Sequence, residues 1–246
     1  MSSGQARSPR LSPWGLLVGG CALVVLVAAI VLAAWSVGSS KERQASYVVR
    51  GTLSGMVLDL GEADVTVVGD GQRKTIAVEH VDHFGFGHGP TVHRTVAGGM
   101  FTVHSRCPRT VLHGCSAGYR VIVPDNLPLT VRTGDGSIAL RGYQGSATVT
   151  SGRGDITVSG YCGFSLQARA DDGGNIAAAT TCPPQQLSMR TTSGAVTAQV
   201  PAGRYRIDAS TSGGRPAIRG IAADSAAPFS VQALSGSGAV VVERAP

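Results

Sequence analysis

The chain has 246 residues, a formal net charge of +6 and only 15% charged side chains. This length allows one sizeable domain with appendages, large enough to bury a proper core. Its 34 glycines and its low aromatic content, 5%, favour a turn-rich β architecture over a helical one. The arginines are scattered and are not interleaved with aromatics on one stretch, so we expect no nucleic-acid partner.

The N-terminal segment predicts a membrane anchor. Residues 1–13 are polar and are expected to form a cytoplasmic tail, whereas residues 14–37 carry no charge. About twenty apolar residues span a bilayer core of roughly 30 Å, and Trp14 and Trp35 bracket the run near the two interfaces. A cleaved signal peptide is the alternative, although its apolar region usually covers only about 7–15 residues. We expect an uncleaved transmembrane helix over 14–37 and a linker over 38–45.

The segment 46–126 alternates between short apolar runs and turn signals without a fixed period. Strands are expected over residues 48–53, 56–60, 65–67, 75–81, 100–104 and 119–123. Turn residues such as Gly69-Asp70-Gly71 separate them. We expect these irregular β-strands to cap the repeat that follows, because an open end of a stack exposes strand edges.

Residues 127–244 contain a repeat of about twenty residues. Glycine turns recur six times, for example at Thr133-Gly134-Asp135-Gly136 and Ser151-Gly152-Arg153-Gly154, and a short alternating segment precedes each turn. Every unit therefore consists of a strand, a turn, a strand and a connector. Such units cannot bury their apolar faces alone and must stack. The sequence predicts an all-β domain, a β-solenoid or β-roll of about six regular rungs.

A β-branched aliphatic residue follows each turn and predicts an internal ladder. In five units it lies two residues past the last glycine, and in the remaining unit Arg215-Pro216 is inserted and Ile218 takes the equivalent place. The predicted ladder contains Ile138, Ile156, Ile176, Val196, Ile218 and Val240. We expect the charged residues Glu243 and Arg244 to blunt the last rung.

The four cysteines beyond the apolar run predict two disulfides. Cys162 and Cys182 each lie six residues past a ladder residue, so they hold equivalent positions on adjacent rungs. Stacked strands lie about 4.8 Å apart, within the Cα separation that a disulfide tolerates. We predict Cys162–Cys182, and Cys107–Cys115 at a hairpin tip. Because disulfides persist in oxidising compartments, the domain over 46–246 is expected to be extracytoplasmic.

Residues 62–67 and 119–124, followed by the repeated Thr-Ser-Gly turns, resemble the putative-adhesin domain family of bacterial envelope proteins. The resemblance covers about residues 46–244 and the apolar run. It implies an N-terminal membrane anchor and an extracytoplasmic β-solenoid-like domain. The family is a domain of unknown function and offers no catalytic residues to transfer. Related domains occur in proteins linked to envelope-stress signalling.

All six histidines lie in one block of the first half, which suggests a metal site as one hypothesis. Along a strand, His80 and Asp82 share one face, whereas Glu79 and His83 share the other. Neutral imidazole is the commonest transition-metal ligand, so His80, Asp82, His83 and His88 are the candidate ligands. The interpretation that we favour is polar side chains on an exposed, irregular half, without a metal.

No motif predicts catalysis or a cofactor. Arg153-Gly154-Asp155 matches a tripeptide read by integrins, but Gly and Asp are expected in a turn for conformational reasons. The glycine-rich residues 85–89 lack the spacing and the strand-to-helix setting of a dinucleotide site. Acidic residues are spread thinly over the rungs, unlike the paired carboxylates of polysaccharide-acting enzymes.

The sequence therefore predicts a non-enzymatic, single-pass membrane protein whose rigid β-solenoid lies at the cell surface. Its repetitive lateral face would contact a partner in the envelope, either a protein or a wall polymer. A regulatory or accessory component of envelope-stress signalling is the alternative, and a polysaccharide-acting enzyme is the third hypothesis.

Overall fold

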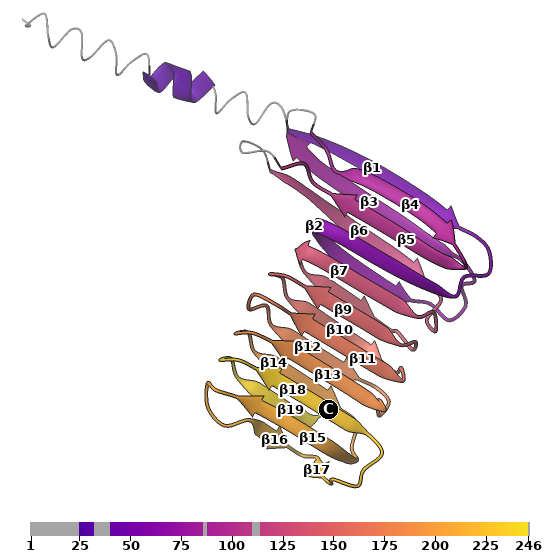
Figure 1. Cartoon of the computed structure of the whole chain (residues 1–246), viewed down its shortest axis with the longest axis vertical. Coiled ribbons are helices and arrows are strands. Elements are labelled where there is room, and N and C mark those ends of the chain that lie inside the picture. Colours follow the sequence, from indigo (N-terminus) through magenta and orange to yellow (C-terminus); the bar gives the residue numbers. More distant parts are fainter. Residues whose placement is uncertain (1–24, 32–39, 86–87, 110–113, 246) are drawn as a thin grey trace, which may run out of the picture.

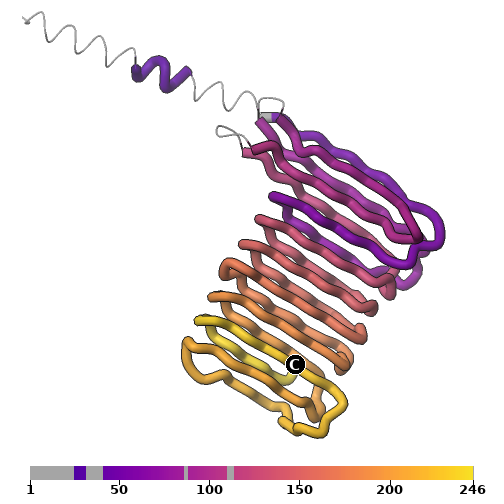
Figure 2. Tube along the Cα trace, viewed as in Figure 1, coloured from indigo at the N-terminus to yellow at the C-terminus, as the bar shows by residue number. Residues whose placement is uncertain are grey.

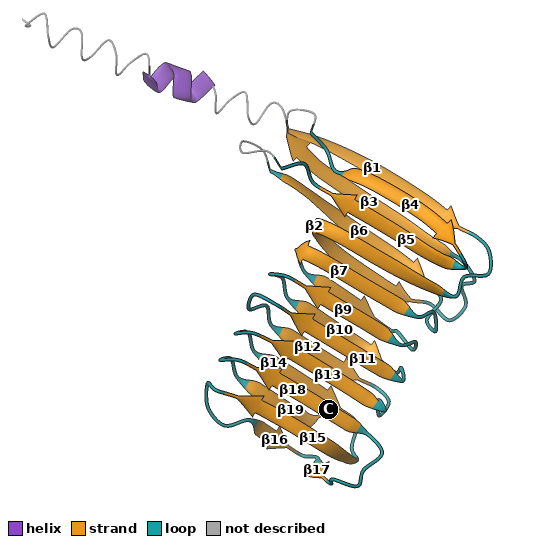
Figure 3. Cartoon of the chain, viewed as in Figure 1, coloured by secondary structure: helices purple, strands orange, loops and turns teal. Residues whose placement is uncertain are grey.

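The computed structural model describes residues 25–31, 40–85, 88–109 and 114–245. Residues 25–31 are helical, and no helix within the described residues is long and apolar enough to cross a membrane. The predicted tail over 1–13 and most of the predicted span over 14–37 lie outside these ranges. From residue 40 onward the described chain is nearly all β (Figures 1 and 3).

The strands follow one another with short connections. The first six are β1 (Ser40–Val49), β2 (Gly55–Gly69), β3 (Ile76–Gly85), β4 (Thr91–Ala97), β5 (Met100–Arg106) and β6 (Cys115–Val123). The next eight are β7 (Leu129–Asp135), β8 (Ile138–Arg141), β9 (Ala147–Ser151), β10 (Ile156–Tyr161), β11 (Ser165–Ala170), β12 (Ile176–Thr180), β13 (Gln186–Thr191) and β14 (Val196–Val200). The last five are β15 (Arg204–Thr211), β16 (Ala217–Arg219), β17 (Ala222–Ala223), β18 (Ser230–Ser235) and β19 (Val240–Arg244).

Two parallel ladders of strands enclose one core. Sheet A runs in the order β6, β2, β8, β10, β12, β14, β19 and β16. Sheet B runs in the order β5, β2, β7, β9, β11, β13, β18 and β15. The long strand β2 serves both ladders. Each strand turns alternate side chains inward, and these form a single buried apolar cluster.

The predicted ladder positions lie in register inside sheet A. Ile138 lies opposite Ile156, Ile156 opposite Ile176, and Ile176 opposite Val196. Val196 then lies opposite Val240. All five side chains are buried, so each rung covers the apolar face of the one before it.

Ile218 does not take the ladder position that the sequence predicts. Its strand partner is Val242, two residues past the ladder residue Val240, and its side chain is 45% exposed. The prediction was wrong for two reasons. Counted from the turn glycines, Ile218 is four residues past Gly214 and Val242 is four past Gly238, so the register stays in step and Arg215-Pro216 is not an insertion. In addition, β16 is the outermost strand of sheet A, so no further rung covers it.

The order of the rungs at the C-terminal end also differs from the order of the chain. Strands β18 and β19 lie between the β13–β14 rung and the β15–β16 rung. In Figure 2 the yellow C-terminal segment accordingly lies inside the orange end of the stack. Glu243 and Arg244 therefore do not blunt the last rung, because β15 to β17 lie beyond them.

The N-terminal end uses the same device. Strand β2 lies between the β5–β6 rung and the β7–β8 rung, although it precedes all four of these strands in the chain. Strands β3 and β1 then extend sheet A, and β4 extends sheet B, all in antiparallel pairing. At each end of the stack, a pair of strands is thus inserted out of chain order: β5 and β6 cover β2, and β15 and β16 cover β18 and β19.

Both predicted disulfides are present. Cys162–Cys182 joins equivalent connectors on adjacent rungs, with a Cα–Cα separation of 4.7 Å. Cys107–Cys115 links the end of β5 to the start of β6, with a Cα–Cα separation of 5.8 Å. The first pairing follows from the rung spacing, as the sequence indicated.

Two buried tyrosines on neighbouring rungs, Tyr143 just after β8 and Tyr161 at the end of β10, make a matched pair for a stability test. The Tyr161 hydroxyl lies 2.7 Å from Ser165 O and 2.9 Å from Gly145 O, whereas the Tyr143 hydroxyl has no hydrogen-bond partner among the described residues. An unpaired buried hydroxyl costs about 1–3 kcal/mol. We expect Tyr143→Phe to raise the free energy of unfolding by about 1 kcal/mol and Tyr161→Phe to lower it by a similar amount. Denaturant titration of both variants measures this; equal shifts would contradict it.

Candidate interaction surface

The outer face of sheet B carries a polar row that crosses the strands. In each strand the inward positions are apolar, as at Leu129 and Val131, so the alternate positions face outward. Strand by strand, the central outward positions align in register. They are Thr130, Thr148, Gln167, Ser188, Gln232 and Asp208. Hydroxyl and amide groups both donate and accept hydrogen bonds.

Three depressions lie along this row and share lining residues. The first, of about 390 Å³, and the second, of about 360 Å³, both touch Thr148 and Gln167. The second and a third, of about 300 Å³, both touch Ser188 and Gln232. We call this continuous feature the sheet B groove; it runs perpendicular to the strands.

A row of arginines flanks the sheet B groove. Arg132, Thr150, Arg169 and Arg190 follow one another in register on β7, β9, β11 and β13. Arg169 and Arg190 lie directly opposite each other on adjacent strands, and like charges in that position repel. Arg169 donates through Nε to Asp171. Within the described residues, Arg190 and Arg132 have no ion-pair partner.

Internal hydrogen bonds hold one end of the groove in place. Ser188 Oγ donates to Gln232 Oε1 at 2.9 Å, and Gln232 Nε2 donates to Asp208 Oδ2 at 3.0 Å. The side chains of Thr148 and Gln167, in the middle of the groove, have no such partner in the described part of the chain. They are therefore available to a ligand without breaking an existing bond.

Asp59 lies next to Arg132 in the register but is already paired with other groups. His104 Nδ1 lies 3.0 Å from Asp59 Oδ2, and Arg106 Nη2 donates to Asp59 Oδ1 at 2.9 Å. Burial alone would raise the pKa of Asp59, but the hydrogen bonds and charge of Arg106 and His104 outweigh it and lower the pKa. The Asp59 carboxylate is thus paired with Arg106 and His104 and not with Arg132.

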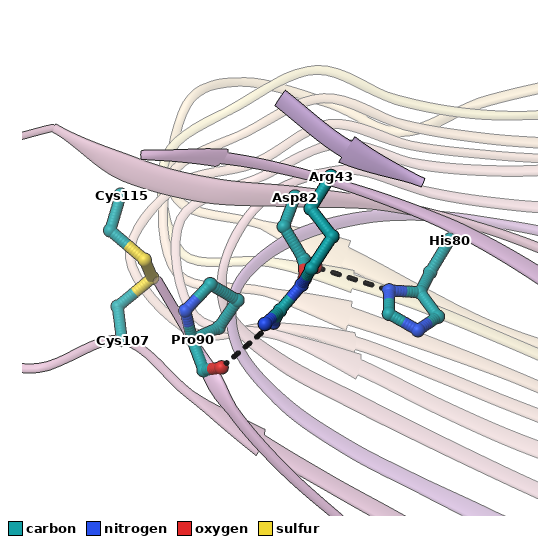
Figure 4. Close-up of polar contacts among 6 residues, drawn as sticks. All are labelled: Arg43, His80, Asp82, Pro90, Cys107 and Cys115. Carbon is teal, nitrogen blue, oxygen red and sulfur yellow. Dashed lines mark hydrogen bonds and ion pairs between the residues drawn. A yellow bond between two sulfur atoms is a disulfide. The ribbon is translucent and has the colours of Figure 1, made fainter. Parts of the chain in front are cut away.

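The candidate metal ligands do not come together. His80 and Asp82 are buried and His83 and His88 are exposed, and within the described residues no three His, Cys, Asp or Glu side chains are placed to share a metal ion. His80 Nδ1 lies 3.1 Å from Asp82 Oδ1, while Arg43 donates to Asp82 Oδ2 at 2.8 and 3.0 Å (Figure 4). Both oxygens of the Asp82 carboxylate are therefore occupied by protein groups.

Aromatic rings surround this buried polar cluster at the N-terminal end of the stack. The His80 ring stacks on Tyr119 at 5.2 Å between centroids, and the Arg94 guanidinium lies 4.3 Å from the centre of the Tyr47 ring. Burial raises the pKa of Tyr47 to about 12. Tyr47 also packs edge-on against Phe101. The cluster ties the outer strands to the core, which is a structural role.

Asp82→Asn tests that structural role. The substitution removes the charge that Arg43 and His80 face while keeping the side chain's size, so we expect the free energy of unfolding to fall by about 1–3 kcal/mol. Asp135→Asn is the control, because the Arg153–Asp135 pair is exposed and such pairs contribute little. Chemical denaturation of both variants provides the measurement. Similar stabilities for the two would show that the Asp82 contacts do not hold the end strands.

Within the tripeptide Arg153-Gly154-Asp155, both charged side chains form hydrogen bonds to neighbouring turns of the stack. Arg153 Nη2 donates to Asp135 Oδ2 at 2.7 Å on the preceding turn. Asp155 Oδ1 accepts the backbone N–H of Asn175, also at 2.7 Å, on the following turn. These side chains join neighbouring turns, as expected for residues chosen by turn conformation.

Comparisons with known proteins give structural matches alone. No protein-family model and no curated protein matches the chain. A putative cell adhesion protein from Clostridium sporogenes is 10% identical with a TM-score of 0.43, over 83% of this chain and 100% of that one. A putative adhesin from Bacteroides fragilis is 9% identical, with a TM-score of 0.35 over 83% and 97%. A putative lipid binding protein from Parabacteroides distasonis is 10% identical, with a TM-score of 0.32 over 85% and 98%.

Proposed function

We propose that the chain is a non-enzymatic cell-surface protein, a β-solenoid that binds a component of the cell envelope through the sheet B groove. Residues 14–37 anchor it in the membrane, and the domain over 46–246 lies outside. The observation that carries this proposal is the continuity of the groove, in which polar groups recur once per strand across six successive strands.

A regular, rigid face suits a long ligand. The groove is built on strands whose inner side chains are buried in one core, so its polar groups are held at the strand spacing of about 4.8 Å. A ligand that spans several strands then meets donors and acceptors that are already ordered, and little entropy is lost on binding. This supports adhesion or attachment more than turnover of a small molecule.

The two disulfides support the extracytoplasmic assignment. Each links segments that are adjacent in the stack, and such bridges are stable in oxidising compartments. The charged groups of the groove support the non-enzymatic assignment. Arg132, Arg169 and Arg190 are spread over four successive strands, rather than converging on one point where a bond could be broken.

Retention on isolated cell envelopes tests this function. Thr148→Tyr places a large ring in the middle of the groove, and we expect the purified full chain carrying it to be retained at least about tenfold less than the parent protein. Thr157→Tyr is the matched control, since Thr157 is an exposed position on the outer face of sheet A. Equal retention of both variants and the parent would refute binding through the groove. A deletion strain with altered stress-gene expression and unchanged envelope attachment would favour the regulatory alternative.

A further inference from the structure

We propose that the ligand of the sheet B groove is a linear polysaccharide bearing carboxylate groups, and that Arg169 and Arg190 bind these groups. This inference rests on the proposed function and names the chemical class of its ligand. It begins with an electrostatic imbalance. Arg169 and Arg190 are directly opposite on adjacent strands, at about 4.8 Å in the strand-to-strand direction, and this juxtaposition is unfavourable without an anion.

The protein's own acids do not resolve this imbalance. Asp171 accepts a hydrogen bond from Nε of Arg169, and the other N–H groups of that guanidinium remain free among the residues that the structure describes. In the described part of the chain neither Arg190 nor Arg132 is paired with a carboxylate, since Asp59 is already held by Arg106 and His104. A guanidinium presents two parallel N–H groups that match the two oxygens of a carboxylate. The arginine row is therefore ready to receive acidic groups from outside.

The neutral part of the groove indicates that the anion is carried on a sugar chain. Thr148 and Gln167 lie beside the arginine row, in the depression that Arg169 and Arg190 also line. Their hydroxyl and amide groups can both donate to and accept from sugar hydroxyls. A polyanion without hydroxyl groups would leave these side chains unused.

An exposed aromatic residue lies at one side of the same groove, next to the start of β11. Phe164 is 60% exposed and lines the depression that is continuous with Thr148 and Gln167. A ring in that position gives the apolar face of a sugar a surface to cover, and it removes apolar area from water when it does so. Phe164, which precedes β11, is followed along that strand by Gln167 and Arg169, so an apolar platform, a hydroxyl-binding group and a charge lie side by side across the width of the groove.

The length of the ligand follows from the geometry of the arginines. Arg132 and Arg169 are separated by one strand that carries Thr150, and Arg190 is on the next strand. Together they cover four strands, about 14 Å. A single sugar is too short to reach across them, so a polymer is expected to bind and a monosaccharide acid is not.

The test measures binding of the purified full chain to three soluble polymers at physiological salt. They are polygalacturonate, which has one carboxylate per sugar, poly-L-glutamate, which has carboxylates but no sugar, and dextran, which has sugars but no charge. We expect polygalacturonate to bind at least about tenfold more tightly than either of the others, because it alone engages both rows. Dextran or polyglutamate binding as tightly as polygalacturonate would overturn the proposal.

A paired double variant assigns the binding to the arginines. Arg169→Gln with Arg190→Gln is expected to weaken polygalacturonate binding by at least about tenfold. Arg120→Gln with Arg141→Gln removes the same charge from the exposed face of sheet A and is expected to leave binding unchanged. Thermal unfolding of the first variant should be no lower than that of the parent, because a repulsive pair has been removed. Equal binding by the two double variants would refute the assignment.

Envelope retention, measured in parallel, separates this inference from the proposed function. If the full chain is retained on envelopes through the groove but binds none of the three polymers, the carboxylated glycan is refuted and the adhesion function stands. If it is retained on neither envelopes nor polygalacturonate, both are refuted.

Discussion

Gly174→Ala is expected to lower the free energy of unfolding by at least about 3 kcal/mol, the upper end of the range for overpacking in a core. A Cβ atom at Gly174 would lie 2.1 Å from the carbonyl oxygen of Gly154 on the preceding turn. The obstacle is backbone, so no side-chain rotation relieves it. The next turn gives no room either, because a Cβ at Gly194 would in turn lie 2.2 Å from Gly174 O. The added methyl group therefore has to push two rungs apart.

Gly118→Ala is the matched control. Gly118 lies in β6 of sheet A, and a Cβ added there meets nothing within 4 Å. Replacing such a glycine restricts the unfolded chain and is neutral or slightly stabilising. Denaturant unfolding of the two variants beside the parent protein gives the comparison. If Gly174→Ala were as stable as Gly118→Ala, successive turns would not be in backbone contact, and the explanation of the glycine repeat would be wrong.

The regular half of the fold was predictable because one local rule is used again and again. Glycines such as Gly154 and Gly174 recur because each turn touches the one before it, and this contact needs no information from distant parts of the chain. The aliphatic residue after the turn then falls in register with its predecessor, as Ile156 does with Ile138. A period in the sequence is thus converted directly into a spacing in the structure.

The ends of the stack were not predictable from the same rule. Strand β19 pairs with β14 from 44 residues away, as Val196 opposite Val240 shows, because β15 to β17 lie beyond them both. The local sequence pattern is the same whether two rungs that are adjacent in the stack are also adjacent in the sequence or are separated by another rung. Ile218 illustrates the consequence, since it lies opposite the buried Val242 but on a strand that no further rung covers.

The groove had a signal in the sequence, but it was a weak one. Outward positions such as Thr148 and Gln167 alternate with buried aliphatics, and this period of two was visible. Connector lengths between rungs vary, however, so the alignment of Arg169 with Arg190 becomes clear from strand pairing rather than from spacing. The candidate histidine site failed for a related reason: His80 and Asp82 do share a face, but that face is buried, and Arg43 satisfies the carboxylate.

Removing the Cys162–Cys182 bridge by a double alanine substitution is expected to lower the free energy of unfolding by about 3 kcal/mol. The bridge closes a loop with a sequence separation of 20 residues, and the loss of its constraint on the unfolded chain gives that magnitude. Packing adds little, because both side chains are only half-buried. For a domain of this size the loss corresponds to a fall in Tm of roughly 6–12 °C.

The Cys107–Cys115 bridge provides the internal comparison. It closes a loop with a sequence separation of only 8, so its removal should cost somewhat less, by under about 1 kcal/mol of difference in the same chain-entropy treatment. Guanidinium unfolding with and without reductant measures both effects: the double alanine variant of one bridge should respond to reductant only through the other. If the Cys162–Cys182 variant matched the parent under oxidising conditions, the hydrogen bonds between β10 and β12 alone would hold these rungs together. The bridge would then contribute nothing to the stability of the stack.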